Sequence, residues 1–345
     1  MKVMHLLESG RYSGAENVVC QIISMFQNDP NMEMVYCSRD GEVRKALEER
    51  RIRFVALDEF TPAEIKKVIK NEKPDIVHAH DMRAGFYAAL SCGKTKLISH
   101  IHNNNFDSRG VSSKSLAYYY AALKAKHIFW VSQSSFDGYV FHKSLRRKSS
   151  VLYNVIDIDA LYIKMEQDTN TYDYDVVYVG RLTYPKNPER LIDVMEQIVV
   201  KHPETKIAII GTGDLEQNVR KLVLEKHLEN NITMLGFNSN PLKIMRDAKV
   251  MLMTSRWEGT PMCALEAMSL GLPIVSTPAD GLCDLIDNGV NGILSESNDV
   301  LAEAVCQVVR SAEVHKKFSE NIMKKAQCMM DTSAYSEKIR NAYTK

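Results

Sequence analysis

The sequence predicts an α/β protein with two doubly wound parallel sheets. The chain of 345 residues is too long for one average hydrophobic core and fits two domains of ordinary size. Short apolar runs alternate with amphipathic stretches whose apolar residues recur three and four positions apart, as in AENVVCQIISMF. Such a βα succession is typical of parallel sheets with helices on both faces. Because the alternation occurs in two series, we expect one domain over 1–155 and a second over 156–329.

Each expected strand is a short apolar run bounded by turn residues or polar residues. In the first domain the expected strands are 2–7, 33–38, 52–57, 75–80, 96–102, 127–132 and 150–154. In the second domain they are 175–180, 206–211, 231–235, 249–254, 273–277 and 291–295. The polar, acidic segment 155–175 shows no clean period and is interpreted as the linker. Residues 298–344 are expected to form helices, of which the last, about 330–345, packs back on the first domain.

Composition argues against several classes of protein. Lys and Arg total 44 and Asp and Glu total 43, and this net charge of +1 argues against bulk nucleic-acid binding. The seven cysteines form no Cys-x-x-Cys pair, which argues against a disulfide framework or a zinc knuckle and favours the reduced cytosol. The apolar run at the N-terminus is too short for a signal peptide or a spanning helix. We therefore expect a cytoplasmic protein, and a peripheral contact with the inner face of the membrane stays open.

The segment 249–277 predicts a strand, a loop, a helix, a turn and a strand. Thr260 followed by Pro261 is typical of a helix start, with an N-cap and then a proline whose missing N–H costs nothing there. We expect a helix from about Pro261 to Leu270, ended by Gly271. Its first backbone N–H groups would form an anion site. These groups belong to Met262, Cys263 and Ala264.

Two glutamates lie on either side of this helix start. Glu258 and Glu266 are eight positions apart, about 12 Å if all the steps were helical, which exceeds the ~5.5 Å of a retaining glycosidase pair. Beside a bound phosphate, such carboxylates can accept hydrogen bonds from the hydroxyls of a sugar and a ribose. The alternative is that Glu258 caps the loop and Glu266 is a solvated helix residue.

Two cations follow the strand at 175–180. Arg181 and Lys186 lie at the same expected sheet edge and can bind a diphosphate and stabilise it as it leaves. The alternative is two ordinary surface cations. The stretch GTGDLEQ at 211–217 also follows a strand and opens a helix, but it lacks the third glycine of a dinucleotide site.

In the first domain, glycines and histidines follow the strands. Gly10 and Gly14 come after the first strand, and Gly14 either permits close backbone approach to a phosphate or sugar or makes a tight turn. The stretches DIVHAHD and LISHIHN each place two histidines on one strand face. Zinc is one interpretation, but no Asp, Glu or Cys spacing supports it. We expect no metal and histidines that line a cleft and hydrogen-bond a substrate.

Tyrosines and cations gather in two stretches of the first domain, 114–127 and 142–150. They could contact an anionic membrane surface or a lipid-diphosphate acceptor. The alternative is a solvated helix face, which is what charge runs usually form.

Taken together, these motifs resemble family 4 of the retaining, nucleotide-sugar-dependent glycosyltransferases. That family has the GT-B fold, in which two Rossmann-like domains face each other across a cleft. The most specific feature is the pattern of Glu, seven residues and Glu over 258–266, followed by AMSLGLPIVST. The motifs DIVHAHD, YVGRLTYPKNPERLIDVM, IIGTGDLEQNVRKL, MLGF and NGVNGIL occur in the family's order. The resemblance extends from the first strand to about Ser295.

The resemblance implies an acceptor domain at the N-terminus, a donor domain at the C-terminus and a role for each motif residue. Glu258 is implied at the hydroxyls of the transferred sugar, and Glu266 at the ribose of the nucleotide. Arg181 and Lys186 match the diphosphate-binding pair, and His102 matches the histidine near the anomeric carbon on the acceptor side. The further implied donor-binding positions are Gly14, Gly211, Gly236, Phe237, Gly259, Thr260, Pro261, Met262 and Cys263.

Two positions depart from the family pattern. The N-terminal loop has Ala15 where the family usually has its second glycine, which weakens the case for a phosphate contact there. Within ADGLCDLI, Asp284 replaces the family's glutamate, which weakens the case for the family's donor contact near Gly281.

The sequence therefore predicts a retaining glycosyltransferase that uses a nucleotide-diphosphate sugar, with a UDP-sugar favoured, and needs no metal or other cofactor. Its acceptor would be a glycan or a lipid-linked hydroxyl compound in the synthesis of a bacterial surface polysaccharide or lipid-linked oligosaccharide, and no nucleic acid is expected as a partner. Three alternatives stay open on the same fold. They are a nucleotide-sugar epimerase or phosphorylase, a catalytically silent binding subunit, and, more remotely, a dehydrogenase.

Overall fold

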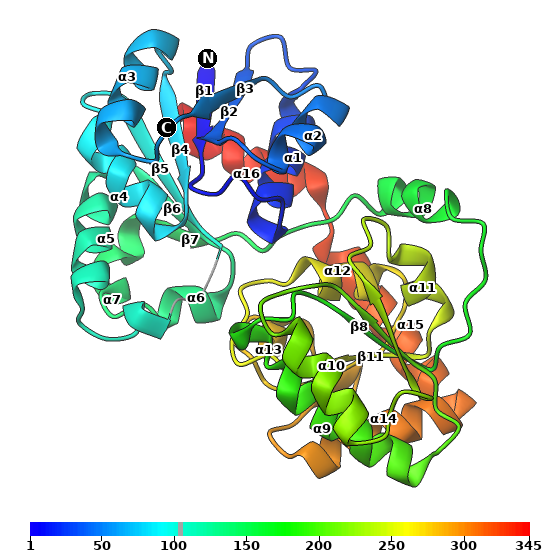
Figure 1. Cartoon of the computed structure of the whole chain (residues 1–345). Helices are drawn as coiled ribbons and strands as arrows, with labels where there is room; N and C mark the ends of the chain where they lie inside the picture. The colour runs from blue at the N-terminus through cyan, green and yellow to red at the C-terminus, as the bar shows by residue number, and fades with distance from the viewer. Residues whose placement is uncertain (103–105) are drawn as a thin grey trace. The chain divides into compact units, whose positions relative to one another are not determined.

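The structure is a computed structural model that describes residues 1–102 and 106–345. The chain forms two compact units. The N-terminal unit consists of Met1–Asn154 together with Thr332–Lys345, and the C-terminal unit consists of Val155–Asp331 (Figure 1). Every strand expected from the sequence overlaps a strand of the structure. The expectation of two doubly wound α/β domains is therefore confirmed.

The N-terminal unit contains a seven-stranded sheet in the order β3-β2-β1-β4-β5-β6-β7, with every strand pair parallel. The strands are β1 (Lys2–Leu6), β2 (Glu33–Arg39), β3 (Phe54–Leu57), β4 (Ile76–His80), β5 (Lys96–Ile101), β6 (His127–Trp130) and β7 (Ser149–Val151). β4 is buried along its whole length, as expected for a central strand covered on both faces. The strand order reverses between β1 and β4, which makes their carboxyl ends the expected ligand edge.

Helices cover both faces of this sheet. Figure 1 shows α3, α4 and α5 along one face and α1, α2 and α16 along the other. The helices and 3-10 turns are α1 (Gly14–Phe26), α2 (Val43–Glu49), α3 (Pro62–Glu72), α4 (Asp81–Ser91), η1 (Phe106–Ser108), α5 (Ser113–Lys124), α6 (Gln133–Asp137), α7 (His142–Leu145), η2 (Arg146–Lys148) and α16 (Thr332–Thr344). The apolar faces of α3, α4 and α5 form one continuous core with the sheet.

The last helix, α16, packs in the N-terminal unit although it is last in the chain. Arg340 forms an ion pair of 2.5 Å with Asp29, and the ring of Tyr343 lies 6.3 Å from that of Phe26 in α1. Lys96 donates a hydrogen bond to the carbonyl of Tyr343. These contacts join the C-terminus to the face of the sheet that α1 covers.

The C-terminal unit contains a six-stranded parallel sheet in the order β10-β9-β8-β11-β12-β13. The strands are β8 (Val176–Val179), β9 (Ile207–Ile210), β10 (Ile232–Gly236), β11 (Val250–Met253), β12 (Ile274–Ser276) and β13 (Gly292–Leu294). The strand order reverses between β8 and β11, so the loops that follow these two neighbouring strands meet at the ligand edge of this sheet.

The helices of this unit are also divided between the faces of the sheet. α9, α10 and α14 cover one face, and α11, α12 and α15 cover the other (Figure 1). The helices and 3-10 turns are α8 (Ile158–Glu166), η3 (Tyr184–Lys186), α9 (Pro188–Lys201), α10 (Glu216–Glu225), α11 (Leu242–Asp247), α12 (Met262–Ser269), α13 (Leu282–Leu285), α14 (Asn298–Arg310) and α15 (Ala312–Met329). Among the described residues, no helix is both long enough and apolar enough to cross a membrane.

The segment 155–175 corrects one expectation, because it contains the helix α8 instead of forming only a linker. The side chain of Asp157 caps this helix by accepting a hydrogen bond of 3.0 Å from the Ala160 N–H. Leu161 is its buried residue, so no apolar period is visible in the sequence. Side-chain bonds to loop 236–241, such as Lys164 to the Ser239 carbonyl, hold the helix in place.

Candidate active site

Two predicted site residues from distant parts of the chain meet at the ligand edge of the C-terminal sheet. Glu258 follows β11 and is buried, with 7% of its surface exposed. Its Oε1 accepts a hydrogen bond of 2.5 Å from Lys186 Nζ and one of 2.6 Å from Ser255 Oγ. Lys186 follows β8, the neighbouring strand. The structure therefore brings a buried carboxylate and an ammonium group together at the point where doubly wound sheets bind ligands.

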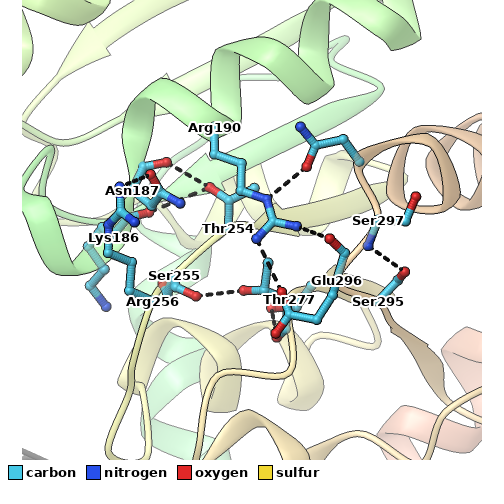
Figure 2. A network of polar contacts seen from close by, with 12 residues as sticks. Lys186, Asn187, Arg190, Thr254, Ser255, Arg256, Thr277, Ser295, Glu296 and Ser297 are labelled. Carbon is cyan, nitrogen blue, oxygen red and sulfur yellow. Dashed lines mark hydrogen bonds and ion pairs between the residues drawn. The ribbon is translucent and has the colours of Figure 1, made fainter. Parts of the chain in front are cut away.

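The loop that carries Lys186 is held by residues that the sequence analysis did not single out (Figure 2). Asn187 has a left-handed backbone with φ of +52°, and its side-chain oxygen accepts a hydrogen bond of 2.7 Å from Arg256. Thr254 donates to the Asn187 carbonyl at 3.1 Å. The backbone N–H of Arg256 donates to the Pro185 carbonyl at 2.8 Å. This network fixes Lys186 against the loop that carries Glu258.

A second part of the network in Figure 2 joins α9 to the loop after β13. Arg190 donates to the Asn298 side chain at 2.7 Å and to the Glu296 carbonyl. Thr277, after β12, donates to the Ser255 carbonyl at 2.7 Å. The loops after β8, β11 and β12 are thereby bonded to one another, and the loop after β13 is bonded to α9. No feature of the sequence identifies these residues, because each acts through a partner that is distant in the chain.

Helix α12 begins one residue later than expected. Pro261 is the N-cap, with extended backbone angles, and the helix runs over Met262–Ser269, so Thr260 does not cap it. The Ala264 N–H donates back to the Pro261 carbonyl at 3.1 Å. The N–H group of Ala264 was expected to be free and is instead bonded within the helix. The helix itself leaves the N–H groups of Met262 and Cys263 unbonded. Gly271, with φ of +71°, follows the end of the helix as predicted.

The charges of Lys186, Glu258 and Glu266 all shift the pKa of the Cys263 thiol. Burial raises the pKa of the Cys263 thiol to about 12, the charge of Lys186 opposes that rise, and the charges of Glu258 and Glu266 add to it. Burial also raises the pKa of Glu266 to about 7, and the charge of Lys164 opposes this shift. Glu258 is buried and bonded to Ser255 within its own loop, which fits a residue that holds the loop, and Glu266 is half-buried within α12 and not fully solvated.

Arg181 lies at the same edge and is exposed. Its carbonyl accepts a hydrogen bond of 3.0 Å from the hydroxyl of Tyr178, which is buried beneath the site. Burial raises the pKa of Tyr178 well above its usual range, the charge of Glu258 adds to the shift, and the charge of Arg181 opposes it. The guanidinium and the buried carboxylate therefore act on the same hydroxyl.

Glycines form the edge next to Arg181. A Cβ on Gly211, which has φ of +136°, would lie 1.9 Å from the Gly180 carbonyl oxygen. The Gly211 N–H donates to the Gly236 carbonyl at 2.7 Å. Phe237 follows with 72% of its surface exposed. The ends of β8, β9 and β10 thus carry half-buried glycines and one exposed aromatic ring.

Gly259 and Thr260 are both buried in the loop before α12. Gly281 packs against this loop, since a Cβ there would lie 1.4 Å from the Gly259 carbonyl oxygen. The Gly281 N–H also donates to the Glu258 carbonyl at 3.3 Å. Gly281 therefore supports the backbone of the loop.

In the N-terminal unit, Gly14 does not form the tight turn that was one of its two interpretations. It is the first residue of α1, Ser13 is the N-cap, and Ser13 and Glu16 form a capping box. A Cβ on Gly14 would meet no atom within 4 Å, whereas a Cβ on Gly10 would lie 2.3 Å from the Asp40 carbonyl oxygen. The close backbone approach in this loop therefore occurs at Gly10.

The predicted histidines lie in the interior of the N-terminal unit instead of on an open wall, because the sheet that carries them is covered by helices. His78 and His100 are fully buried, and His80 and His102 are 2% and 6% exposed. A fifth member, His5 of β1, was not predicted from the sequence and is also fully buried. Ring nitrogens of His5, His78 and His80 lie within 4.8 Å of one another, as do those of His80, His100 and His102.

His102 ends this group at the carboxyl edge of the sheet. Its backbone N–H donates at 2.9 Å to Asp81, a residue with φ of +69°. Its ring Nε2 lies 2.8 Å from Nδ1 of His80. Burial lowers the pKa of His102 to about 3, so the ring is neutral at physiological pH.

Comparisons with known proteins identify the family and the fold. Residues 163–325 match the sequence model of the glycosyl transferases group 1, and residues 12–160 match that of glycosyltransferase family 4. An uncharacterized glycosyltransferase of Methanocaldococcus jannaschii is 29% identical over 75% of this chain and 77% of its own. The UDP-Gal:alpha-D-GlcNAc-diphosphoundecaprenol alpha-1,3-galactosyltransferase of Escherichia coli is 24% identical over 87% and 85% of the two chains.

Among solved structures, that of Anabaena HepE in complex with UDP-glucose aligns with a TM-score of 0.88 and 21% identity, covering 100% of this chain and 99% of that one. This likeness confirms the expected fold class. The motif order, the two parallel-sheet units and the two family models lead to one conclusion. The chain belongs to the glycosyl transferases of group 1, in glycosyltransferase family 4, with the GT-B fold.

Proposed function

We propose that this glycosyltransferase moves a sugar from a nucleotide-diphosphate sugar, with UDP favoured, to a hydroxyl group, and that the anomeric configuration is retained. The observation that carries the proposal is the pair of Lys186 and Glu258 at the start of α12. The UDP-glucose complex of HepE supports the donor class, and the lipid-diphosphate acceptor named for the Escherichia coli relative supports an acceptor in surface polysaccharide or lipid-linked oligosaccharide synthesis.

In this proposal the donor diphosphate binds between cations and amides. Lys186, Arg181 and the N–H groups of Met262 and Cys263 bind its oxygens and stabilise the charge that develops as it leaves. The ammonium group of Lys186 has three N–H donors, so it can bond to a phosphate oxygen and keep its bond to Glu258. Oε1 of Glu258 accepts the two internal bonds, and we assign Oε2 to the hydroxyls of the sugar.

The reaction breaks the bond between the anomeric carbon and the phosphate oxygen and forms a bond from that carbon to the acceptor oxygen on the same face. The acceptor proton moves to an oxygen of the departing diphosphate. We assign no covalent nucleophile, and the side chains of the site act by binding and by charge stabilisation. Glu266 accepts hydrogen bonds from the ribose hydroxyls, Gly211, Gly236 and Phe237 form the edge that contacts the base, and His102 lies on the acceptor side.

A panel of nucleotide sugars tests this proposal. A donor at about 100 times its Kd stabilises the folded state by about 2.7 kcal/mol, so a UDP-sugar is expected to raise Tm while ADP- and GDP-sugars raise it less. The bound donor is then incubated alone and with acceptor. A change in the sugar without acceptor would identify an epimerase, and the absence of any Tm shift across the panel would favour the silent binding subunit.

The pKa of Glu266 predicts how donor binding depends on pH. Only the ionised carboxylate accepts hydrogen bonds with both oxygens, so donor affinity is expected to increase as pH rises through about 7 and to level off above it. Glu266→Gln is expected to weaken donor binding roughly tenfold and to remove this pH dependence. Calorimetric titration across pH checks both, and Glu303→Gln on the exposed face of α14 is the matched control. A flat profile for the unaltered protein would contradict the assignment of Glu266.

The acceptor class leads to a proposal about a surface of α5. Leu116, Tyr120 and Leu123 are 51%, 40% and 55% exposed on one stripe of this helix. Lys148 bonds to the last carbonyls of α5, so η2, with the exposed Arg146 and Arg147, lies at its C-terminal end. An apolar stripe bordered by cations fits an anionic membrane surface, where a lipid-linked acceptor would lie.

Leu116→Glu combined with Leu123→Glu is expected to weaken binding to phosphatidylglycerol vesicles by roughly tenfold or more, because two leucines lose their burial in the lipid interface. Co-sedimentation with vesicles measures this. Val200→Glu is the matched control, since Val200 is 76% exposed on α9 of the other unit. If the double variant and the control sediment equally, α5 is a solvated face.

A further inference from the structure

Three buried histidines of the N-terminal unit form a hydrogen-bonded chain that ends at a methionine. Nε2 of His102 lies 2.8 Å from Nδ1 of His80, and Nε2 of His80 lies 3.0 Å from Nδ1 of His5. Nε2 of His5 lies 3.3 Å from Sδ of Met34 in β2. The chain therefore crosses three neighbouring strands, from the carboxyl end of β5 through β4 to β1.

All three rings are neutral. Burial lowers the pKa of His5 and of His102 to about 3, and burial together with neighbouring histidines holds the pKa of His80 well below its usual range. A neutral imidazole carries one N–H donor and one acceptor nitrogen, so each bond in the chain determines the direction of the next.

Met34 decides that direction, because a thioether accepts hydrogen bonds and has no proton to donate. Nε2 of His5 must therefore carry the proton, and Nδ1 of His5 must accept from Nε2–H of His80. Nδ1 of His80 in turn accepts from Nε2–H of His102. The last nitrogen, Nδ1 of His102, is left with a lone pair, and this buried atom has no hydrogen-bond partner within residues 1–102 and 106–345.

We propose that Met34, His5 and His80 are positioning residues that hold His102 in its Nε2–H tautomer, so that its buried, unpartnered Nδ1 keeps a lone pair for a substrate hydroxyl that reaches it. The role toward substrate rests on the proposed sugar transfer, whereas the tautomer order does not. The reverse order would place a buried N–H of His102 without an acceptor and would set the lone pair of His5 against that of Met34. Because the chain ends at a thioether, it orients His102 and carries no proton.

Two neighbours hold the end of the chain in place. The ring of His100 stacks on that of His102 with centroids 4.1 Å apart, and Asp81 accepts from the His102 backbone N–H. His78, by contrast, bonds to Tyr343 at 2.6 Å and takes no part in the chain. Tyr343 is therefore available as a control that perturbs a buried histidine of the same sheet without touching the three bonds.

Long-range ¹H–¹⁵N correlation spectra of the full protein labelled in histidine test the tautomers without any substrate. His5, His80 and His102 are all expected as Nε2–H tautomers, and an Nδ1–H signal for His102 would overturn the proposal. Met34→Leu keeps the volume but removes the acceptor, so His102 is expected to populate both tautomers. Tyr343→Phe is expected to leave the three tautomers unchanged.

Steady-state kinetics test whether the histidine chain affects sugar transfer. His80→Leu breaks the chain and is expected to lower kcat roughly tenfold, the effect of losing one hydrogen bond to the reacting substrate, with a smaller change in the KM for the donor. Circular dichroism confirms that each variant is folded. An unchanged kcat in folded His80→Leu would refute the role toward substrate, and unchanged tautomers in Met34→Leu would refute the role of Met34. If the unaltered protein transfers no sugar, the proposed function fails while the spectra still decide the tautomer order.

Discussion

Lys186→Ala is expected to reduce sugar transfer by about 10²- to 10³-fold, because the variant loses a positive charge that stabilises the departing diphosphate. The loss should appear in kcat and in donor affinity, since the same ammonium group contacts the diphosphate before and during its departure. A radiolabelled transfer assay with a saturating donor separates the two effects. Transfer at the rate of the unaltered protein would refute the site.

The same substitution also leaves Glu258 as a buried carboxylate without its ion-pair partner, which is expected to lower the free energy of unfolding. Combining Lys186→Ala with Glu258→Gln removes the unpaired charge, so stability is expected to recover while transfer does not. Lys201→Ala is the matched control, because Lys201 forms an exposed ion pair with Glu303. Denaturant unfolding of the four proteins then separates the catalytic loss from a loss of stability.

Gly281→Ala is expected to slow sugar transfer roughly 10²-fold without removing any group that contacts the donor. The backbone at Gly281 has an ordinary φ of −60°, but the new Cβ would lie 1.4 Å from the Gly259 carbonyl oxygen, so the loop before α12 must move. A displacement of about 1 Å at a reacting centre costs roughly 10²-fold in rate. Overpacking also costs about 1–3 kcal/mol of stability.

Thermal unfolding and a transfer assay check this prediction together. Gly110→Ala is the control, because a Cβ at Gly110 would meet no atom within 4 Å and should leave Tm and transfer unchanged. A Gly281→Ala protein with full activity would mean that the loop carrying Glu258 tolerates displacement. The proposed need for a fixed carboxylate would then be wrong.

The fold could be predicted because buried parallel strands are continuous apolar runs, and these runs are visible in any one sequence. Helix α8 could not, because a side-chain cap and contacts to a distant loop stabilise it and no apolar stripe marks it. The same limit applies to α12, where Thr260 and Pro261 predicted a helix start but could not show which residue is the cap. Local patterns thus locate elements and leave their ends to backbone geometry.

The candidate site was predictable as a set of residue types and not as a set of contacts. Arg181 and Lys186 were singled out because they follow a strand, and Glu258 and Glu266 because of their spacing around an expected helix start. That Lys186 bonds to Glu258, and that Arg256 and Asn187 hold the loop between them, depends on β8 and β11 being neighbours. His5 was missed because one histidine in an apolar strand carries no signal until β4 lies beside it.

By itself the sequence determined the alternation of strands and helices, the division into two series and the chemical types of the residues at the strand ends, because these follow from local periodicity and composition. Only the tertiary structure decided which of those residues touch, since hydrogen bonds across parallel strands join segments far apart in the chain. The ion pair between Lys186 and Glu258 and the histidine chain from His102 to Met34 both exist for that reason.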